Sequence, residues 1–478
     1  MKGKPYWLLG VLTMSACGGR SSLLDGWDQR ASADSGGSSG GARGGTAAKG
    51  GAAPVIGGTF SEGGSSGDLL AHFQLGSDHE VRVADVATSR DRRVAVTGSF
   101  RGKLNVGGHV IDSPPRGNQP LPTAAFVASF DGSGKPEWAY AYPNEPEYQA
   151  TGLRFAPNGD IVFQAHTFYD REPAAVVGRL DPQGQPLWST AWGQAGHIQT
   201  ARVGIDNGGR IWLSGSFRST LDFGGSALDA GLESSGYLLE LSSDGGLLRA
   251  FGVKAPDWLS SEVQGMAVDD EDNVLVVGTG RLKKDNQALA FLQKFSSSGD
   301  LVYAKTFMGN IIPMGVAVDR RMRTTLFAHF SGSFSNEDTV LGAGPAASTL
   351  WLAQYSRDGA LTWQQAFKGD VTSSGGSTDP FDNIVVAGIG PLVVDGQVLQ
   401  SPHAAELGST DLSFVMKLRP DGSRVWLHAL GGSITLNGVA TDNDAFIWLG
   451  STFESQVWVD DAKLSTKDTA GLLLELSP

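Results

Sequence analysis

The sequence predicts an all-β fold built from seven copies of one unit, each with four strands. A turn residue is followed eleven residues later by a Phe or Gly that ends a strand, and this interval recurs throughout the chain. The pairs are Ser89/Phe100, Pro157/Phe168, Asp206/Phe217, Asp269/Gly280, Asp319/Phe330, Asp379/Gly390 and Asp442/Phe453. The spacing between copies varies, which places the insertions in loops. Repeats of this size with strand-like content are typical of a β-propeller.

The first two strands of the unit flank a tight turn. The first strand is short and apolar, as in residues 203–205, and a turn rich in Asp, Asn and Gly follows it. The second strand, for example residues 211–217, is apolar on both faces, as expected for a strand packed between neighbouring sheets. In the sixth unit the first strand should lie near residues 373–378, although this stretch is polar and rich in glycine.

A mostly small residue stands two positions before each strand-ending Phe or Gly. The seven residues are Gly98, His166, Gly215, Gly278, Ala328, Gly388 and Ser451. Because glycine inside a strand marks close backbone approach, the pattern predicts radial packing near a narrow axis. His166 is the exception. His329 stands one position out of register with it, so we expect the two imidazoles to face opposite sides of their sheets.

The third and fourth strands are joined by a second tight turn. The third strand is almost continuously apolar, as in residues 175–180 and 350–355. A glycine supplies the positive φ of the turn, and an aromatic residue four positions later opens the fourth strand. The pairs are Gly134/Trp138, Gly184/Trp188, Gly299/Tyr303, Gly359/Trp363 and Gly422/Trp426. The third unit departs from this pattern, since Arg249 follows Gly245.

The chain ends before the seventh unit has a fourth strand. Residues 69–76, just before the first unit, have the composition of a fourth strand. Pairing them with residues 471–476 would close the ring and remove an open sheet edge. The sequence therefore predicts a seven-bladed β-propeller of four-stranded blades over residues 68–478, with the last blade closed by strand 69–76. An open two-sheet or solenoid array of the same units is the alternative.

The N-terminus has the pattern of a secretory signal over residues 1–17: Lys2 and Lys4, an apolar run and then small residues. Residues 14–17 resemble the lipobox of bacterial lipoproteins, in which the cysteine is lipidated. Cys17 is the only cysteine of the chain and has no disulfide partner within it. The alternatives are an ordinary signal peptide and a short transmembrane anchor, although the apolar run is too short to span a bilayer. Gly18 after the cysteine favours, by the same resemblance, the outer membrane.

Gly and Ser dominate residues 18–67, which predicts a disordered tether with an average reach of roughly 35–40 Å. The net charge of −13 disfavours nucleic acid and anionic lipid surfaces as partners. We therefore expect a lipid anchor, a long linker and a globular head.

We find no catalytic, cofactor-binding or metal-binding pattern in the sequence. The eight histidines lack short metal-ligand spacings. The acidic cluster at residues 269–273 lacks the spacing of a calcium loop, and it falls, like residues 442–444, at a first turn where Asp and Asn are expected. Trp212 and Trp448 share one strand position, which favours a place in the core between blades over a sugar-stacking role.

The repeated unit, carried well by residues 211–225 and 414–426, resembles the SBBP-type bacterial β-propeller repeat. It is similar to the secreted propeller lipoproteins of myxobacteria, a resemblance that implies fold and location and no catalytic residue. Residues 180–188 also resemble quinoprotein-like propellers. Quinone-dependent dehydrogenases of that shape often use a vicinal cysteine pair, which this chain lacks, and the propeller lipoprotein of outer-membrane protein assembly fits better in anchor and fold.

Three functions follow as hypotheses. The first is an exported, lipid-anchored interaction module of the cell envelope that binds a protein or polysaccharide through a propeller face, without catalysis or cofactor. The second is a propeller enzyme, such as a lyase, hydrolase or quinoprotein, with an active site on the axis. The third is a structural envelope component without a discrete ligand.

Overall fold

The computed structural model describes residues 67–113, 122–142, 148–167, 175–193, 198–337, 339–343, 348–407, 411–459 and 462–478. The predicted signal peptide, Cys17, the tether up to residue 66 and Phe168 lie outside the described residues. Strands dominate the described part, whose one helix, α1, is a single turn at Ala404–Leu407.

Repeats one to five each form a four-stranded antiparallel sheet. Repeats one and two contribute β2 (Val81–Thr88), β3 (Val94–Arg101), β6 (Thr123–Phe130) and β7 (Pro136–Ala141), then β8 (Gln149–Phe155), β9 (Ile161–His166), β10 (Ala175–Leu180) and β11 (Pro186–Trp192). Repeats three and four contribute β12 (Ile198–Ile205), β13 (Ile211–Asp222), β14 (Ala227–Leu241) and β15 (Leu247–Val253), then β16 (Trp258–Val268), β17 (Val274–Leu282), β18 (Ala288–Phe295) and β19 (Leu301–Met308). Repeat five contributes β20 (Asn310–Val318), β21 (Thr324–Ser331), β24 (Thr349–Tyr355) and β25 (Leu361–Phe367).

Repeats six and seven share a nine-stranded sheet with the order β26-β27-β30-β31-β32-β33-β1-β4-β5. Its strands are β26 (Thr372–Thr378), β27 (Ile384–Ile389), β30 (Leu412–Leu418), β31 (Arg424–Thr441), β32 (Ile447–Val459), β33 (Ala462–Leu476), β1 (Leu69–Ser77), β4 (Lys103–Val106) and β5 (His109–Asp112). The long strand β31 pairs with β30 in its first half and with β32 in its second. The polar strand β26 lies where the sequence predicted it and pairs with β27, with a register shift between Ser373 and Gly375.

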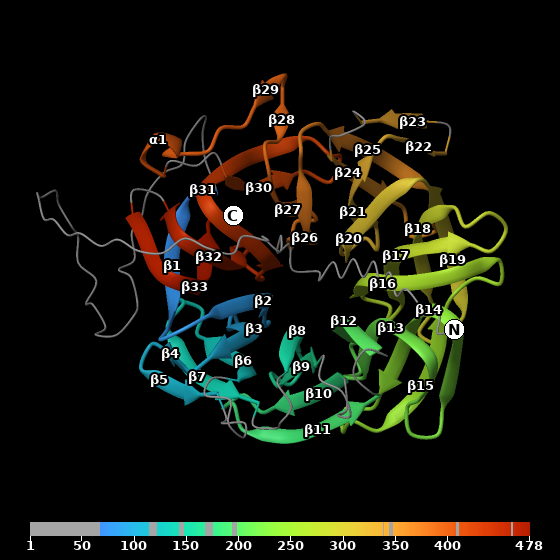
Figure 1. Ribbon diagram of the computed structural model, residues 1–478, viewed down its shortest axis with the longest axis horizontal. Coiled ribbons are helices and arrows are strands. Elements are labelled where there is room, and N and C mark those ends of the chain that lie inside the picture. The colour runs from blue at the N-terminus through green and yellow to red at the C-terminus, as the bar shows by residue number, and fades with distance from the viewer. Residues whose placement is uncertain are drawn as a thin grey trace, which may run out of the picture.

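The sheets are arranged radially around a common centre, with the first strand of each repeat innermost (Figure 1). This is the architecture of a β-propeller, so the predicted all-β propeller fold is confirmed. The N-terminal strand β1 pairs antiparallel with the C-terminal strand β33, in a register that sets Phe73 opposite Leu473 and Leu75 opposite Gly471. The predicted pairing of the two chain ends is therefore confirmed.

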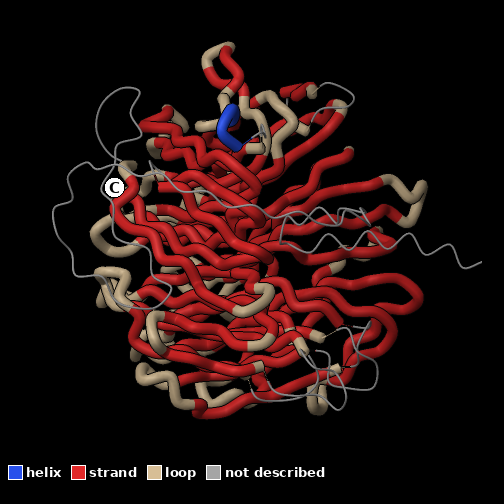
Figure 2. The backbone as a smooth tube through the Cα atoms, turned by 60° about the vertical axis from the view of Figure 1, so that its left-hand side comes forward, coloured by secondary structure: helices blue, strands red, loops and turns tan. Residues whose placement is uncertain are grey.

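The insertions of the repeats lie between their second and third strands. They comprise the extensions of β13 and β14, the pair β4 and β5, β22 (Ser333–Asn336) with β23 (Thr339–Gly342), β28 (Val393–Val394) with β29 (Gln397–Val398), and α1. A four-stranded meander has its first and third connections at one end and its second at the other. The insertions therefore share one side of the ring, the loop face, and the tight turns share the opposite side, the turn face. Figure 2 shows α1 beside a protruding hairpin at the periphery.

Every first strand carries a β-bulge at the same place, which fixes the alignment of the repeats. The bulge shows that the sequence alignment placed repeat two one residue too late. Its turn begins at Ala156, whose amide donates to Asp160 O at 2.7 Å, rather than at Pro157. The small residue of this repeat is therefore Ala165, and His166 is in register with His329. The prediction that the two histidines face opposite sides of their sheets was wrong.

The small residue of the second strand is required by the neighbouring backbone. A Cβ at Gly98 would lie 1.9 Å from the carbonyl oxygen of Arg82, and a Cβ at Gly215 would lie 2.0 Å from that of Gln199. In both repeats this carbonyl belongs to the first strand just before its bulge. Close approach of the bulged strand, rather than packing around the axis, explains the recurring glycine.

Aromatic side chains at the start of the fourth strands connect neighbouring repeats. The indole of Trp138 donates from Nε1 to Pro182 O at 3.0 Å and lies against Gly184, so repeat one contacts the second turn of repeat two. Trp363 makes the same bond to Pro420 O. These contacts recur around the ring and tie each sheet to the next.

Repeats three and seven lack this aromatic residue and have a tryptophan on the second strand instead. Trp212 and Trp448 are 0 % and 1 % exposed and pack in the cores that join their sheets to the next repeats, which confirms their predicted core role. The indole of Trp448 reaches Gly134 in repeat one, where a Cβ would lie 3.5 Å from the ring. Arg249 in repeat three covers the neighbouring turn through hydrogen bonds to Ser297 and Ser298.

Candidate functional site in the central channel

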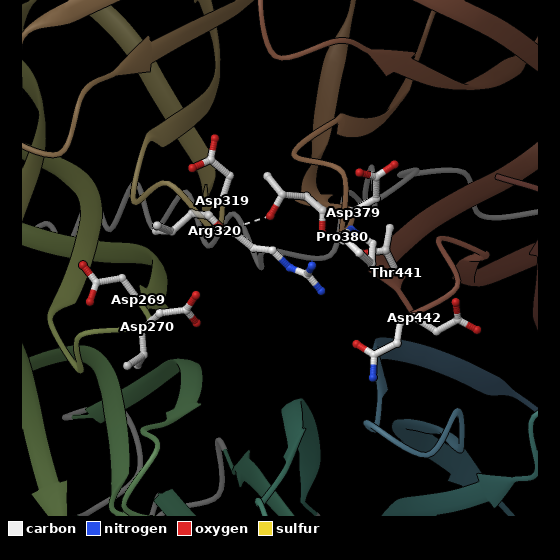
Figure 3. Close-up of a pocket in the computed structure, with 12 residues that line it drawn as sticks. Asp269, Asp270, Asp319, Arg320, Asp379, Pro380, Thr441 and Asp442 are labelled. Atoms are coloured by element: carbon white, nitrogen blue, oxygen red, sulfur yellow. Dashed lines mark hydrogen bonds between the residues drawn. The ribbon is translucent and has the colours of Figure 1, made fainter.

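The first turns of repeats four to seven surround a polar cavity of about 180 Å³ at the turn-face mouth of the channel (Figure 3). The lining residues are Val268, Asp269, Asp270, Val318, Asp319, Arg320, Thr378, Asp379, Pro380, Thr441, Asp442 and Asn443. Four of these residues are aspartates that occupy the same turn position in their repeats: Asp269, Asp319, Asp379 and Asp442.

The structure shows that these carboxylates are committed to the turns. Asp269 Oδ1 accepts hydrogen bonds from the amides of Glu271 at 3.0 Å and Asn273 at 2.9 Å, and its Oδ2 pairs with Lys294 Nζ at 2.8 Å. The side chains of Asp269 and Lys294 are 0 % and 2 % exposed. The sequence interpretation of the 269–273 cluster as a turn is in accord with this geometry.

The other three aspartates repeat the arrangement with different cations. The ion pairs are Asp319–Arg323 at 2.6 Å, Asp379–Lys417 at 2.9 Å and Asp442–Arg92 at 3.3 Å. In Figure 3 the labelled carboxylates of these turn aspartates point away from the cavity. Because each carboxylate accepts turn amides and faces a cation, the aspartates hold the turns and do not present free ligands to the mouth.

The residues that follow the turn aspartates are the ones that face the cavity. Arg320 is exposed and its guanidinium extends into the cavity, and Asp270 lies across from it (Figure 3). Asn443 is exposed and donates from Nδ2 to Arg90 O at 2.8 Å. These side chains differ from repeat to repeat, so the mouth is chemically asymmetric although its backbone is repeated.

A second group of charged residues lies deeper in the channel, on the innermost strands of repeats one to three. Arg154 donates from Nη1 to Asp85 Oδ2 at 2.8 Å, and the same oxygen accepts the amide of Leu153 at 3.3 Å. Arg202 donates from Nη1 to Thr151 O at 3.3 Å. Sequence reasoning missed this group because each residue resembles an ordinary polar strand residue. Only the ring brings the three strands together.

The two in-register histidines are buried in the sheets. His166 Nδ1 lies 3.2 Å from Thr200 Oγ1, and burial lowers the pKa of His166 to about 4. Burial likewise lowers the pKa of His329 to about 4. Both imidazoles are therefore neutral near pH 7. Among the described residues no group of three or more His, Cys, Asp or Glu is arranged to hold a metal ion.

Comparisons with known proteins add little beyond the fold. No family model matches the chain, and no curated protein matches it. A polysaccharide lyase, Uly1, is 10 % identical with a TM-score of 0.45, covering 85 % of this chain and 99 % of its own. The β-propeller domain of the Trilobed protease from Pyrococcus furiosus is 9 % identical with a TM-score of 0.44, covering 82 % and 97 %. Sqt1 from Chaetomium thermophilum is 11 % identical with a TM-score of 0.42, covering 86 % and 99 %.

These likenesses concern architecture alone and carry no functional argument. Within the described residues, no helix has the length and apolar character needed to cross a membrane.

Proposed function

We propose that this protein is an exported, lipid-anchored, non-catalytic interaction module whose seven repeats form seven propeller blades and whose loop face binds a protein partner of the cell envelope. Lipidation at Cys17 and the tether up to residue 67 would hold the propeller away from the membrane. A polysaccharide is the alternative ligand.

Exposed apolar side chains on the insertions carry this proposal. Four separate insertions each present one such side chain: Val110 on β5 is 55 % exposed, Leu232 on β14 101 %, Val340 on β23 72 % and Val398 on β29 49 %. Loops on a rigid scaffold are the usual carriers of binding function. Aliphatic groups held in water on several insertions of one face favour a protein surface over a sugar, which would require aromatic platforms and hydrogen-bonding groups.

The turn face is less suited to catalysis than to binding. The carboxylates of the four turn aspartates at its mouth are tied to turn amides and cations, so they are poorly suited to act as a general acid or base. This supports binding rather than chemistry at the turn-face cavity.

Proximity labelling in the producing cells tests the loop-face proposal. The full-length protein is compared with a variant carrying Val110→Ser, Leu232→Ser, Val340→Ser and Val398→Ser. A matched control carries Leu187→Ser, Leu248→Ser, Leu301→Ser and Val302→Ser, which alters the same number of exposed apolar residues on the fourth strands. We expect a reproducible partner to be lost only from the first variant. Equal labelling by all three proteins would contradict the proposal, and binding to a glycan array that survives the changes would favour a polysaccharide.

The anchor is tested separately. Cys17→Ser should abolish incorporation of labelled fatty acid and release the protein from the membrane fraction. Retention of the label in this variant would refute lipidation at Cys17.

A further inference from the structure

Two positions on the innermost strands have small residues in most repeats, but repeats one to three carry a charged residue at one of them. The position after the bulge is glycine in five repeats: Gly152, Gly265, Gly315, Gly375 and Gly438. Repeats one and three have Asp85 and Arg202 there instead.

Two positions further along, the other repeats have only Ala, Gly or Ser, and repeat two has Arg154. The glycines let neighbouring inner strands pack closely: a Cβ at Gly265 would lie 3.0 Å from the Cα of Gly315. Natural sequences break a local packing rule mainly at functional or strained sites.

The three charged side chains line the channel rather than the sheet interior. Strand β8 pairs on one side only, with β9, so its other edge faces the centre of the ring (Figure 1). The carboxylate of Asp85 bonds the amide of Leu153 on this free edge, and Arg202 bonds the carbonyl of Thr151 on the same edge. Strands β2, β8 and β12 therefore place the three side chains together on the channel wall.

The charges in this sector do not cancel. Asp85 and Arg154 form an ion pair at 2.8 Å, with side chains 7 % and 36 % exposed. Arg202 is half-buried, and its acceptors are the carbonyls of Thr151 at 3.3 Å and Ala201 at 3.4 Å, both from Nη1. No carboxylate in the described part pairs with it. A guanidinium has five N–H donors, so most of the hydrogen-bonding capacity of Arg202 is unused.

Two threonine hydroxyls of strands β8 and β12 contact each other in this part of the ring. Thr151 Oγ1 and Thr200 Oγ1 lie 2.8 Å apart, on the strands that carry the carbonyl acceptor and Arg202 itself. Thr200 Oγ1 also contacts His166 Nδ1 at 3.2 Å, so these hydroxyls are engaged with each other and with the imidazole. Arginine is the side chain best suited to bind a planar carboxylate or a phosphate through paired N–H groups, and Arg202 therefore carries the binding capacity of this wall.

We propose that the channel wall at Asp85, Arg154 and Arg202 is a binding site for a single oxyanion, the carboxylate or phosphate group of a small ligand. Arg202 makes the charge-assisted contact. Asp85 holds Arg154 in place, so that one net positive charge faces the channel. The site is independent of the loop-face partner.

Isothermal titration of the purified full-length protein tests this site at low ionic strength near pH 7. Inorganic phosphate and galacturonate serve as separate probes. We expect saturable one-to-one binding of at least one of them and a loss of affinity of tenfold or more in Arg202→Gly, which installs the residue found at this position in five repeats. Arg202→Gln, which keeps the volume and removes the charge, should weaken binding to a similar extent. Arg218→Ala, an exposed arginine on β13, should leave it unchanged.

The two probes identify the ligand chemistry. Binding of galacturonate alone assigns a carboxylate ligand, and binding of phosphate alone assigns a phosphate. The proposal is overturned if neither anion binds saturably, or if both folded Arg202 variants bind as tightly as the unaltered protein.

Discussion

The amide of Asp68 donates a hydrogen bond of 3.0 Å to Ser477 Oγ, although the two residues are 409 positions apart in the sequence. The amide of Ser477 returns a bond of 2.9 Å to Asp68 O. In repeat three, Ser242 and Gly246 make the same two bonds within one continuous turn, at 3.0 and 2.8 Å. The two ends of the chain therefore rebuild, without a peptide link, the turn that joins a third strand to a fourth.

The rebuilt turn also has its glycine. Gly67 adopts a positive φ of +99°, as the equivalent turn glycines do at +77° to +88°, and a Cβ there would lie 2.8 Å from the ring of Trp426. Trp426 of repeat six thus covers Gly67 of the rebuilt turn in repeat seven. In the same way, Trp363 of repeat five covers Gly422 in the continuous turn of repeat six. Closure of the ring extends the contact pattern of the other repeats across the chain break.

The first prediction concerns this closure. Ser477→Ala removes the acceptor of the Gly67 and Asp68 amides and should lower the free energy of unfolding by about 1–2 kcal/mol. Ser242→Ala removes one matching contact from a turn that peptide bonds hold together, so its effect should be smaller. Urea unfolding followed by tryptophan fluorescence measures both. Equal losses would show that the rebuilt turn does not limit stability.

The second prediction concerns Glu475, which lies on β33 opposite Ala71 and Trp448. Burial raises the pKa of Glu475 to about 7; Arg92 opposes the shift and Asp442 adds to it. Because the folded pKa lies above the unfolded value, the folded state binds the proton more tightly. The stability contributed by the protonated form is complete below about pH 4.5 and is lost as the pH rises through about 7.

Glu475→Gln should remove this pH dependence and stabilise the protein at pH 8 by about 1–2 kcal/mol, a value reduced for partial solvent screening. Melting temperatures at pH 5 and pH 8 give the test. Glu240→Gln changes the equivalent residue of repeat three, which pairs with Arg210 at 2.8 Å and with Arg249. That control should be destabilised at both pH values. A Glu475→Gln variant that is less stable at pH 8 would disprove the assignment.

The repeat pattern was sufficient to predict the propeller and the pairing of its two ends, because both follow from hydrophobic alternation and turn chemistry. The alignment failed in repeat two, where Asn158 and Gly159 mimic the turn of the other repeats one position late. The start of the second strand at Ile161, equivalent to Val94 and Ile211, would have corrected it. The channel charges could not be predicted, since Asp85, Arg154 and Arg202 meet only after ring closure.

The third prediction concerns the buried ion pair of repeat four. Lys294→Met leaves the carboxylate of Asp269, which is 0 % exposed, without its cation, and should cost about 3–5 kcal/mol. The double variant Lys294→Met with Asp269→Asn removes both charges and should recover part of the loss. Lys305→Ala, which breaks the more exposed pair with Glu337 at 3.4 Å, should change stability by less than about 1 kcal/mol. A similar loss in the single and double variants would show that charge pairing is not the cause.

The fourth prediction concerns the tryptophan that replaces the missing outer aromatic of repeat seven. Trp448→Val introduces the residue that repeats two and six have at this position. In those two repeats the fourth strand supplies a tryptophan instead. The fourth strand of repeat seven has Ala71 at the equivalent position. In the variant, therefore, no aromatic ring packs against Gly134 of repeat one, and a cavity opens between the sheets of repeats seven and one. Thermal unfolding should reveal a loss of about 2–4 kcal/mol.

Leu275→Val is the matched control for this change, because repeat four keeps Tyr303 on its outer strand. It should cost about 1 kcal/mol. The tryptophan variant should also raise hydrogen exchange at β1 and β2, which flank the junction of repeats seven and one. If its exchange rises uniformly around the ring instead, Trp448 contributes general hydrophobic burial and has no special role in joining the last sheet to the first.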